Sequence, residues 1–228
     1  ELTVDCTKIS PEQMDTFPPG QIASNAIHLE PRPLNPSAFI IQGSPFFVGR
    51  ATDDLYLLNA SPTGQRLLSL LEQAFSTSGK PITINELKLS VNGEFIPEDK
   101  AGAEKAYIEN GQAGTPSYGG HIWYSAHNMK SGTPSVIVLF HELCHAYNLV
   151  TGTRLRGTSL DADIGPYMPR APIKNTELQA VGLPTEASPF DFDGDPNTPP
   201  TTTNPEAFSE NALRKELGWN LRMQYSLG

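Results

Sequence analysis

The stretch HELCHAYN, residues 141–148, contains three side chains whose types and spacing suit metal chemistry. Residues four apart lie on one face of an α-helix, so His141 and His145 can present two imidazole nitrogens to one metal ion about 2 Å away. Glu142 is turned about 100° from His141, which places its carboxylate beside the metal rather than on it. From there it can accept a proton from a zinc-activated water and deliver it to a leaving amine. The spacing therefore indicates a zinc hydrolase.

The alternative is an accidental match on an ordinary amphipathic helix. With 5 histidines and 25 acidic residues, H-E-x-x-H arises in roughly 1% of shuffled chains of this length. The surrounding run PSVIVLFHELCHAYNLV is apolar on nearly all sides, which predicts a central, buried helix that starts at Thr133 or Ser135. Two histidines and a glutamate are costly to bury there without a function. The context therefore favours the metal site.

A catalytic zinc ion takes three protein ligands and keeps a fourth position open, so a third ligand must be found. One class of peptidase supplies a histidine ten residues after the first, but Thr151 stands there and Asn148 stands where that class has glycine. A second helix that carries a glutamate, with a small residue three positions later, could pack close instead. Glu177 and Ala180 in NTELQAVG fit this pattern, and Glu177 is the predicted third ligand. The competing acidic residues are Asp161, Asp163 and Glu186, and Glu177 itself could be an exposed first-turn carboxylate.

A peptidase also needs a group that stabilises the oxyanion of the tetrahedral intermediate. Arg222 and Tyr225, in LRMQY, are three residues apart on what could be the end of the last helix, and they could converge on the zinc ion. The alternative is that both are surface residues, which is common for an arginine and a tyrosine near a chain end. We therefore treat the pair as candidate catalytic residues.

A peptide substrate would bind extended, as an added strand at the edge of a sheet. The segment GGHIWYSA, residues 119–126, is short, aromatic and bounded by glycines, which favours a strand, and it is our candidate edge. It could equally be an ordinary aromatic strand in which His121 or His127 is merely hydrogen-bonded.

The other elements are predicted from periodicity and turn residues. The proline-rich residues 1–45 are expected to form an extended arm before one folded domain at 46–228. Strands are predicted at 46–48, 80–91 and 119–126. Helices are predicted from Ser61 or Thr63 onward, over 175–182, and from Ser209 to Gly218. Long loops are predicted at 93–118, 151–175 and 188–208.

Composition excludes several classes of partner. The 228 residues suit one sizeable domain, and 21 prolines with 19 glycines predict a large share of loop. The net charge of −9, without a cluster of Lys and Arg, argues against nucleic acid or an anionic membrane as the main partner. We expect no membrane span, because no run of about 18 apolar residues exists. We also see no signal peptide, and the first residue, Glu1, suggests a processed or excised fragment.

Two minor features are left for the structure to place. The only cysteines, Cys6 and Cys144, are too few for a disulfide framework or a Cys-rich zinc site. Cys144 is predicted to be a packed core thiol, whereas Cys6 in the arm could bind the zinc ion and hold the enzyme latent. The carboxylates at 191, 193 and 195 suggest either a calcium loop or, as we prefer, an acidic turn.

Three blocks of the chain, in this order, resemble the M91 family of effector metallopeptidases. They are H-E-x-x-H at 141–145, E-L-x-A-V-G at 177–182, and E-N-x-L-R-x-E-x-G at 210–218 followed by R-x-x-Y at 222–225. The resemblance covers roughly residues 46 to 228, with an apparent insertion at 191–206. The R-x-x-Y pair is also similar to that of clostridial neurotoxin light chains.

The resemblance implies an α+β, zincin-like fold with a small mixed sheet packed on the central H-E-x-x-H helix. It implies zinc bound by His141, His145 and Glu177, with Glu142 as the base. Members are zinc proteases that bacteria inject through type III or type VI secretion systems, so it also implies a secreted toxin, a protein substrate in the target cell, and a secretion apparatus or spike protein as partner. The rival hypotheses are a zinc hydrolase of a non-protein amide or ester, and an inactive zinc-containing binding module.

Overall fold

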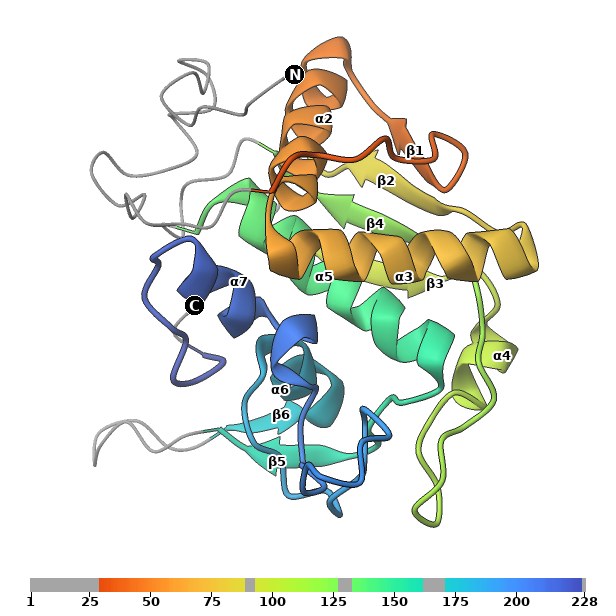
Figure 1. Ribbon diagram of the computed structural model, residues 1–228, viewed down its shortest axis with the longest axis vertical. Helices are drawn as coiled ribbons and strands as arrows, with labels where there is room; N and C mark the ends of the chain where they lie inside the picture. The colour runs from red at the N-terminus through yellow and green to blue at the C-terminus, as the bar shows by residue number, and fades with distance from the viewer. Residues whose placement is uncertain (1–28, 89–92, 127–132, 162–170, 227–228) are drawn as a thin grey trace.

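The computed structural model describes residues 29–88, 93–126, 133–161 and 171–226, and these form an α+β fold around a small mixed sheet (Figure 1). The sheet has the strand order β1-β2-β4-β3, in which β1, β2 and β4 are parallel and β3 is antiparallel. Its strands are β1 (Phe39–Gln42), β2 (Ile82–Glu86), β4 (Gly120–Tyr124) and β3 (Glu94–Pro97). A second sheet pairs β5 (Thr158–Leu160) with β6 (Pro172–Lys174).

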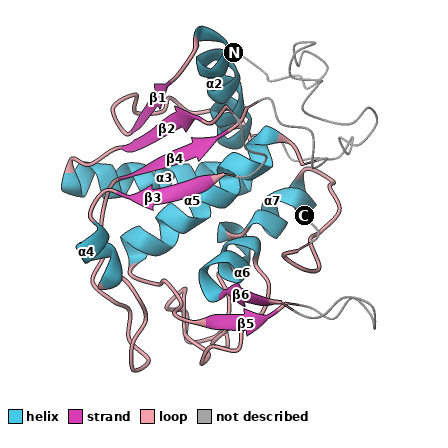
Figure 2. Ribbon diagram, turned by 180° about the vertical axis from the view of Figure 1, so that it is seen from behind, coloured by secondary structure: helices cyan, strands magenta, loops and turns pink. Residues whose placement is uncertain are grey.

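Helices cover one face of the main sheet (Figures 1 and 2). They are α2 (Pro45–Asn59), α3 (Pro62–Ser78) and α5 (Ser135–Thr151). In β4 the residues alternate, so that Ile122 and Tyr124 are buried while His121 and Trp123 are exposed. The shorter helices α4 (Lys100–Glu104), α6 (Asn175–Val181) and α7 (Glu210–Glu216), with the 3₁₀ helix η2 (Glu206–Phe208), complete the described elements. None of the described helices combines the length and apolar character that a membrane crossing requires.

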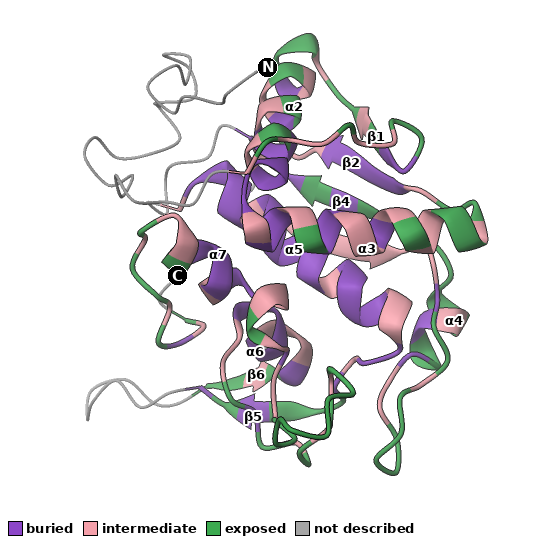
Figure 3. Ribbon diagram, viewed as in Figure 1, coloured by how far each residue is buried: buried purple, intermediate pink, exposed green. Residues whose placement is uncertain are grey.

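Helix α5 is central, as its apolar sequence predicts. It contacts α2, α3, α6, α7, β3 and β4. Most of its residues are buried, as the purple parts of α5 in Figure 3 show. It starts at Ser135 and ends at Gly152, whose φ of 70° is the left-handed conformation that glycine adopts easily. Cys144 of α5 is fully buried in the hydrophobic core, which confirms the prediction of a packed thiol. Cys6 lies outside the described residues.

The predicted strand at 46–48 is wrong, because these residues form the first turns of α2. Ser44 caps this helix by accepting a hydrogen bond from the backbone N–H of Phe47, and Pro45 occupies its first turn. The same Ser-Pro signal starts α3 at Ser61, where the helix prediction is confirmed.

The prediction that residues 119–126 form a sheet edge is also wrong, although they do form the strand β4. This strand lies between β2 and β3. The edge on that side is β3, which falls in the stretch 93–118 predicted to be a loop, as does α4. The predicted loop at 151–175 likewise contains β5 and β6. Among the described residues no strand pairs with the outer side of β3, so the free edge of β3, rather than β4, is available for an added strand.

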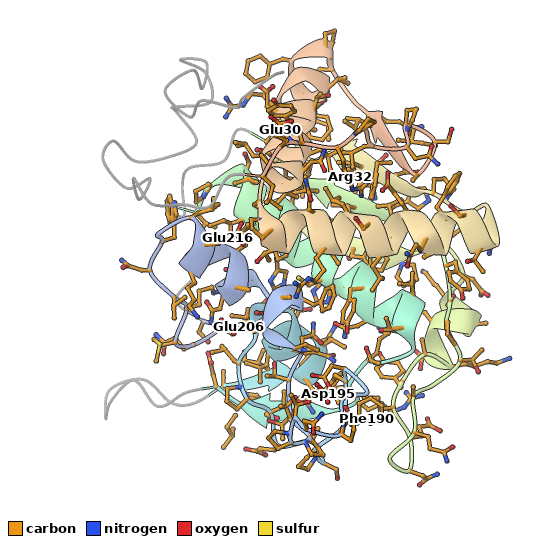
Figure 4. The ribbon with its side chains drawn as sticks, in the orientation of Figure 1. Glu30, Arg32, Phe190, Asp195, Glu206 and Glu216 are labelled. Carbon is orange, nitrogen blue, oxygen red and sulfur yellow. The ribbon has the colours of Figure 1, made fainter. Side chains whose placement is uncertain are left out.

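The described part of the predicted arm, residues 29–45, runs along the main domain and contributes to its core. Ala38 and Phe39 are buried, and β1 pairs in parallel with β2. Arg32 forms an ion pair with Glu72 of α3 (Figure 4). Residues 38–42 thus belong to the folded core, and the arm prediction for residues 1–28 lies outside the described residues.

The C-terminal part is tied to the helical layer at several points. Helix α7 begins after the cap Ser209, as predicted, but it ends at Glu216, so Arg222 and Tyr225 follow the helix instead of lying on it. The side chain of Glu216 points to the start of α3, where its Oε2 accepts a hydrogen bond from the backbone N–H of Thr63 at 3.0 Å (Figure 4). These contacts fix where the last residues of the chain lie.

The acidic stretch at 191–198 is a turn held by its own carboxylates. Asp191, Asp193 and Asp195 each accept a hydrogen bond from a backbone N–H two or three residues later. Among the described residues, these three aspartates do not form a cluster that could hold a metal ion. The preferred interpretation, an acidic turn, therefore agrees with the structure better than a calcium loop does.

A buried carboxyl group beside the start of α5 predicts a pH-dependent stability. Burial raises the pKa of Asp54 to about 7, although hydrogen bonds from Ser135 and Tyr124 and the charge of Arg50 lower it. The folded protein then holds this proton more tightly than the unfolded chain, so Asp54 loses its stabilising effect as pH rises from about 4 to about 7. Relative to Asp54→Asn, the free energy of unfolding of the wild type should fall by up to about 1.4 kcal/mol per pH unit across this range. Urea denaturation of both proteins at pH 4 to 8 measures the difference, and parallel pH profiles would contradict it.

Candidate metal centre

Three predicted ligands come together where α5 meets α6. His141 and His145 lie one turn apart on α5, with ring centroids 4.9 Å apart. Their Nε2 atoms each lie 3.3 Å from Oε2 of Glu177, which is in the first turn of α6. The ligand atoms of all three residues lie within 4.8 Å of one another, and no other such group exists in the described ranges.

Helix α6 packs against both α5 and α7, and it carries small residues that suit close packing. Ala180, three residues after Glu177, is completely buried and belongs to the core cluster around α5. The C-cap Gly182 has a φ of 89°, and a Cβ there would lie 2.7 Å from the side chain of Ser209. The small residue three positions after the glutamate thus serves the close packing for which it was singled out.

The rival third ligands lie elsewhere or have other partners. Asp161 is buried and accepts hydrogen bonds from the backbone N–H groups of Tyr225 and Ser226, both at 2.8 Å. Glu186 is exposed and faces the backbone N–H of Leu160. Asp163 lies outside the described residues. Among the residues compared, only Glu177 joins the histidines.

The electrostatics of the cluster favour a positive charge between the three ligand atoms. Burial opposes a charged His141, but hydrogen bonds to Glu177 and Glu210 raise its pKa to about 10. Burial also opposes a charged Glu177, yet His145 and His141 hold its pKa well below the ordinary range. The cluster therefore stabilises a cation and carboxylate together, which is the condition a metal ion requires.

The donor set fits zinc. Two imidazoles and one carboxylate are a common ligand set of catalytic zinc, with a fourth position left for water or substrate. A tetrahedral ion about 2.0–2.1 Å from its ligands spaces them by about 3.3 Å. Both histidine Nε2 atoms lie 3.3 Å from the Glu177 oxygen. These two spacings therefore already suit the ion, and all three ligand atoms lie within 4.8 Å of one another.

Glu142 lies beside the ligands and lines the same cavity. Only 4% of it is exposed, and burial raises its pKa above the ordinary value. Gly93, directly before β3, allows the strand to pass close by, because a Cβ at this position would lie 2.5 Å from Oε1 of Glu142. The carboxylate thus stands between the metal cluster and the edge strand.

Glu210 is the residue of this site that sequence reasoning missed. It is 1% exposed, and its Oε2 lies 2.8 Å from Nδ1 of His141. Arg214 and Arg222 donate hydrogen bonds to its two oxygens at 2.6 and 3.0 Å. Burial opposes its charge, but His141 and the two arginines lower its pKa to about 2. A charged Glu210 therefore fixes the His141 ring so that Nε2 faces Glu177.

Arg222 and Tyr225 do converge on the cluster, although from the turn after α7 rather than from the helix. The hydroxyl of Tyr225 donates a hydrogen bond to Oε2 of Glu177 at 3.0 Å. The guanidinium of Arg222 lies 4.9 Å from the centre of the Tyr225 ring and also bonds the Tyr225 carbonyl and Glu210. Burial and the charge of Glu177 raise the pKa of Tyr225, so its hydroxyl remains a proton donor.

A cavity of about 570 Å³ joins the metal cluster to the free edge of β3. Its lining includes Glu94, Phe95 and Pro97 of β3 together with the three ligands, Glu142, Arg222 and Tyr225. Within the described ranges no strand pairs with the outer side of β3, which borders the site where chemistry would occur, so an extended chain could pair with it.

Comparison with known proteins places this arrangement in a family. A model of the family Peptidase M91, described as effector protein, matches residues 35–225. The match includes β1 and all three motif blocks, and it begins earlier than the resemblance noted from the sequence. No curated protein and no solved structure is similar to the chain at a significant level. Because the match spans most of the chain, the protein belongs to the Peptidase M91 family of effector peptidases.

Proposed function

We propose that this chain is a zinc-dependent endopeptidase with a zincin-like fold that hydrolyses a peptide bond in a protein of the target cell. The observation that carries the proposal is the cluster of His141, His145 and Glu177, with Glu142 beside it in one cavity. Family membership supports a peptidase and an effector. Delivery by a secretion apparatus or a spike protein is the part of the proposal that rests on the family alone.

In this proposal the chain's own residues divide the work of hydrolysis. Zinc held by His141, His145 and Glu177 would supply a Lewis acid that activates water and polarises the peptide carbonyl. Glu142 accepts the proton of the attacking water and passes it to the leaving amine. Its burial favours this role, because burial raises its pKa and a carboxylate with a raised pKa is a stronger base near neutral pH.

Tyr225 is the proposed donor to the oxygen that gains negative charge. Its hydroxyl lies at the cavity wall, beside the ligand Glu177, and can turn from that carboxylate to a carbonyl oxygen of the substrate. Arg222 holds the Tyr225 segment by bonding its carbonyl and packing over its ring. Asp161 fixes the same segment through the backbone of Tyr225.

The substrate would lie extended along β3. The antiparallel edge strand borders the cavity and leads past Glu142. Pairing with its backbone would give affinity that is independent of the substrate sequence, and side-chain contacts would give specificity. This geometry favours a peptide over a small non-protein amide or ester.

The proposal predicts that new protein termini form only when zinc is bound. Removal of the metal with a chelator should abolish cleavage, and added zinc should restore it, whereas Mg²⁺ should not, because magnesium prefers oxygen ligands to imidazole. The measurement is mass spectrometry of labelled N-termini in a target-cell lysate, with chelated and zinc-loaded protein in parallel. Zinc binding without any zinc-dependent terminus would contradict the peptidase proposal and favour the binding-module or non-protein alternatives.

A further inference from the structure

The lining of the cavity includes two basic residues that take no part in the metal cluster. They are Arg154 and Lys174, which together with Tyr107 we call the basic end. Arg154 follows the end of α5, and Lys174 directly precedes α6. The segments that carry Tyr107 and Arg154 are joined by a parallel β-bridge. The basic residues are therefore carried by segments that continue directly from the two helices holding the metal ligands.

The guanidinium of Arg154 is held in one orientation. It lies 4.2 Å from the centre of the Tyr107 ring, and its Nη1 donates a hydrogen bond to the carbonyl of Ala103 at 2.8 Å. The backbone of Arg154 is bonded on both sides, to the carbonyl of Ala106 and to the N–H of Ile108. A group fixed in this way loses little entropy when it binds a ligand.

The charge of Arg154 has no carboxylate partner among the described residues. Arg156 is a useful contrast, because it lies over the same Tyr107 ring at 4.1 Å but forms ion pairs with Glu104 and Glu109 at 3.2 and 3.1 Å. Neither Arg154 nor Lys174 forms an ion pair within the described ranges, in a chain with 25 acidic and 16 basic residues. The cavity lining also contains glutamates, but none of them forms an ion pair with Arg154 or Lys174 within the described residues, so these two charges suit a negatively charged ligand.

The basic end is within reach of a peptide bound at the metal site. Six residues of α5 separate His145 from Thr151, a rise of about 9 Å. An extended peptide covers this distance in about three residues. On this estimate, a substrate strand along β3 with its scissile bond beside Glu142 brings a side chain to the end of α5, after which Arg154 lines the same cavity.

We propose that Tyr107, Arg154 and Lys174 form a substrate subsite for an acidic side chain, located about three residues from the bond that is cut. The guanidinium offers a planar pair of N–H donors that matches a carboxylate. Because the chain as a whole has a net charge of −9, it does not attract acidic proteins in general. The attraction acts only at the basic end, so it selects substrates that have an acidic residue at one position. This inference deepens the proposed peptidase function and rests on it.

The experiment begins with cleavage-site profiling of a proteome-derived peptide library by the zinc-loaded enzyme. Asp and Glu should be enriched at one position, two to four residues from the cut. A matched peptide pair with Asp or Asn at this position should then differ about tenfold in kcat/KM, as expected for a partly buried charged hydrogen bond. Arg154→Gln should bring the Asp-to-Asn ratio of kcat/KM close to one. Lys174→Gln should lower this ratio by less, because the side chain of Lys174 is exposed. Arg156→Gln is the matched control and should leave the ratio unchanged.

A binding assay separates the subsite from catalysis. Two pools of labelled heptapeptides, alike except for a fixed Asp or Asn, are titrated against zinc-loaded Glu142→Gln protein with and without Arg154→Gln. Tighter binding of the Asp pool that depends on Arg154 supports the subsite even if no peptide is cut. Cleavage without acidic preference, or a preference that survives Arg154→Gln, overturns the subsite while the peptidase function stands. Equal binding of the two pools overturns it as well.

Discussion

Replacement of Glu142 by glutamine is expected to lower kcat by about 10³-fold while zinc remains bound. The amide keeps the size of the side chain in its tight place against Gly93 but cannot accept a proton from water. General-base catalysis contributes roughly 10²- to 10⁴-fold, and Glu142 lies beside the ligands without being one of them. Rates are measured on the peptides found by cleavage-site profiling, and metal content on the same samples.

The control for this variant is Glu206→Gln, which makes the same chemical change on the surface, where Glu206 pairs with Lys215. It should retain the activity of the wild type. If Glu142→Gln keeps full activity, Glu142 is not the base. If it loses its zinc together with activity, the carboxylate has a structural role that the proposal does not assign to it.

The sequence was most informative where chemistry is local. His141, Glu142 and His145 share one helical turn and an apolar helix, so both their spacing and their burial could be predicted. Glu177 could be predicted because the small Ala180 follows it at the spacing needed for close helix packing. In each case the deciding signal lies within a few residues of the side chain concerned.

Contacts between distant segments were out of reach. Glu210 is 69 residues from His141 in the chain, and nothing in its own neighbourhood says that its oxygens face a histidine and two arginines. Arg222 and Tyr225 were placed on a helix by spacing, yet the helix ends at Glu216 and the turn that follows brings them to the cluster. Their convergence depends on Asp161, a residue considered only as a rival metal ligand.

The errors in the fold have similar causes. The Phe-Phe-Val run at 46–48 favours a strand by residue type, but the Ser44–Pro45 cap and apolar spacing further along make a helix. Strand β3 is only four residues long, in a polar stretch, and is stabilised by pairing with β4 rather than by its own propensity. Which strand forms the edge follows from this non-local pairing, and so does the location of the proposed substrate groove.

Replacement of Glu177 by alanine is expected to lower zinc affinity more than about 100-fold, because it removes one of three ligands, whereas changes to residues that only orient a ligand cost 10- to 100-fold. The two histidines would remain on α5, held by the buried core and by Glu210, so the loss should be one of metal and not of the fold. Zinc content after dialysis and the increase in melting temperature on zinc addition both measure it, since a ligand that binds only the folded state stabilises that state.

Glu186→Ala is the matched control for this ligand, because it removes another carboxylate that the sequence alone left open, one that is exposed and outside the cluster. It should bind zinc as the wild type does. Undiminished zinc in Glu177→Ala would show that the third ligand lies elsewhere, and Asp163, outside the described residues, would then be tested in the same way. If only Glu177→Ala loses its zinc, the metal is bound by a ligand on α6. The roles proposed for Tyr225 and Glu142 would then be supported, because the Tyr225 hydroxyl bonds Glu177 and Glu142 lines the same cavity.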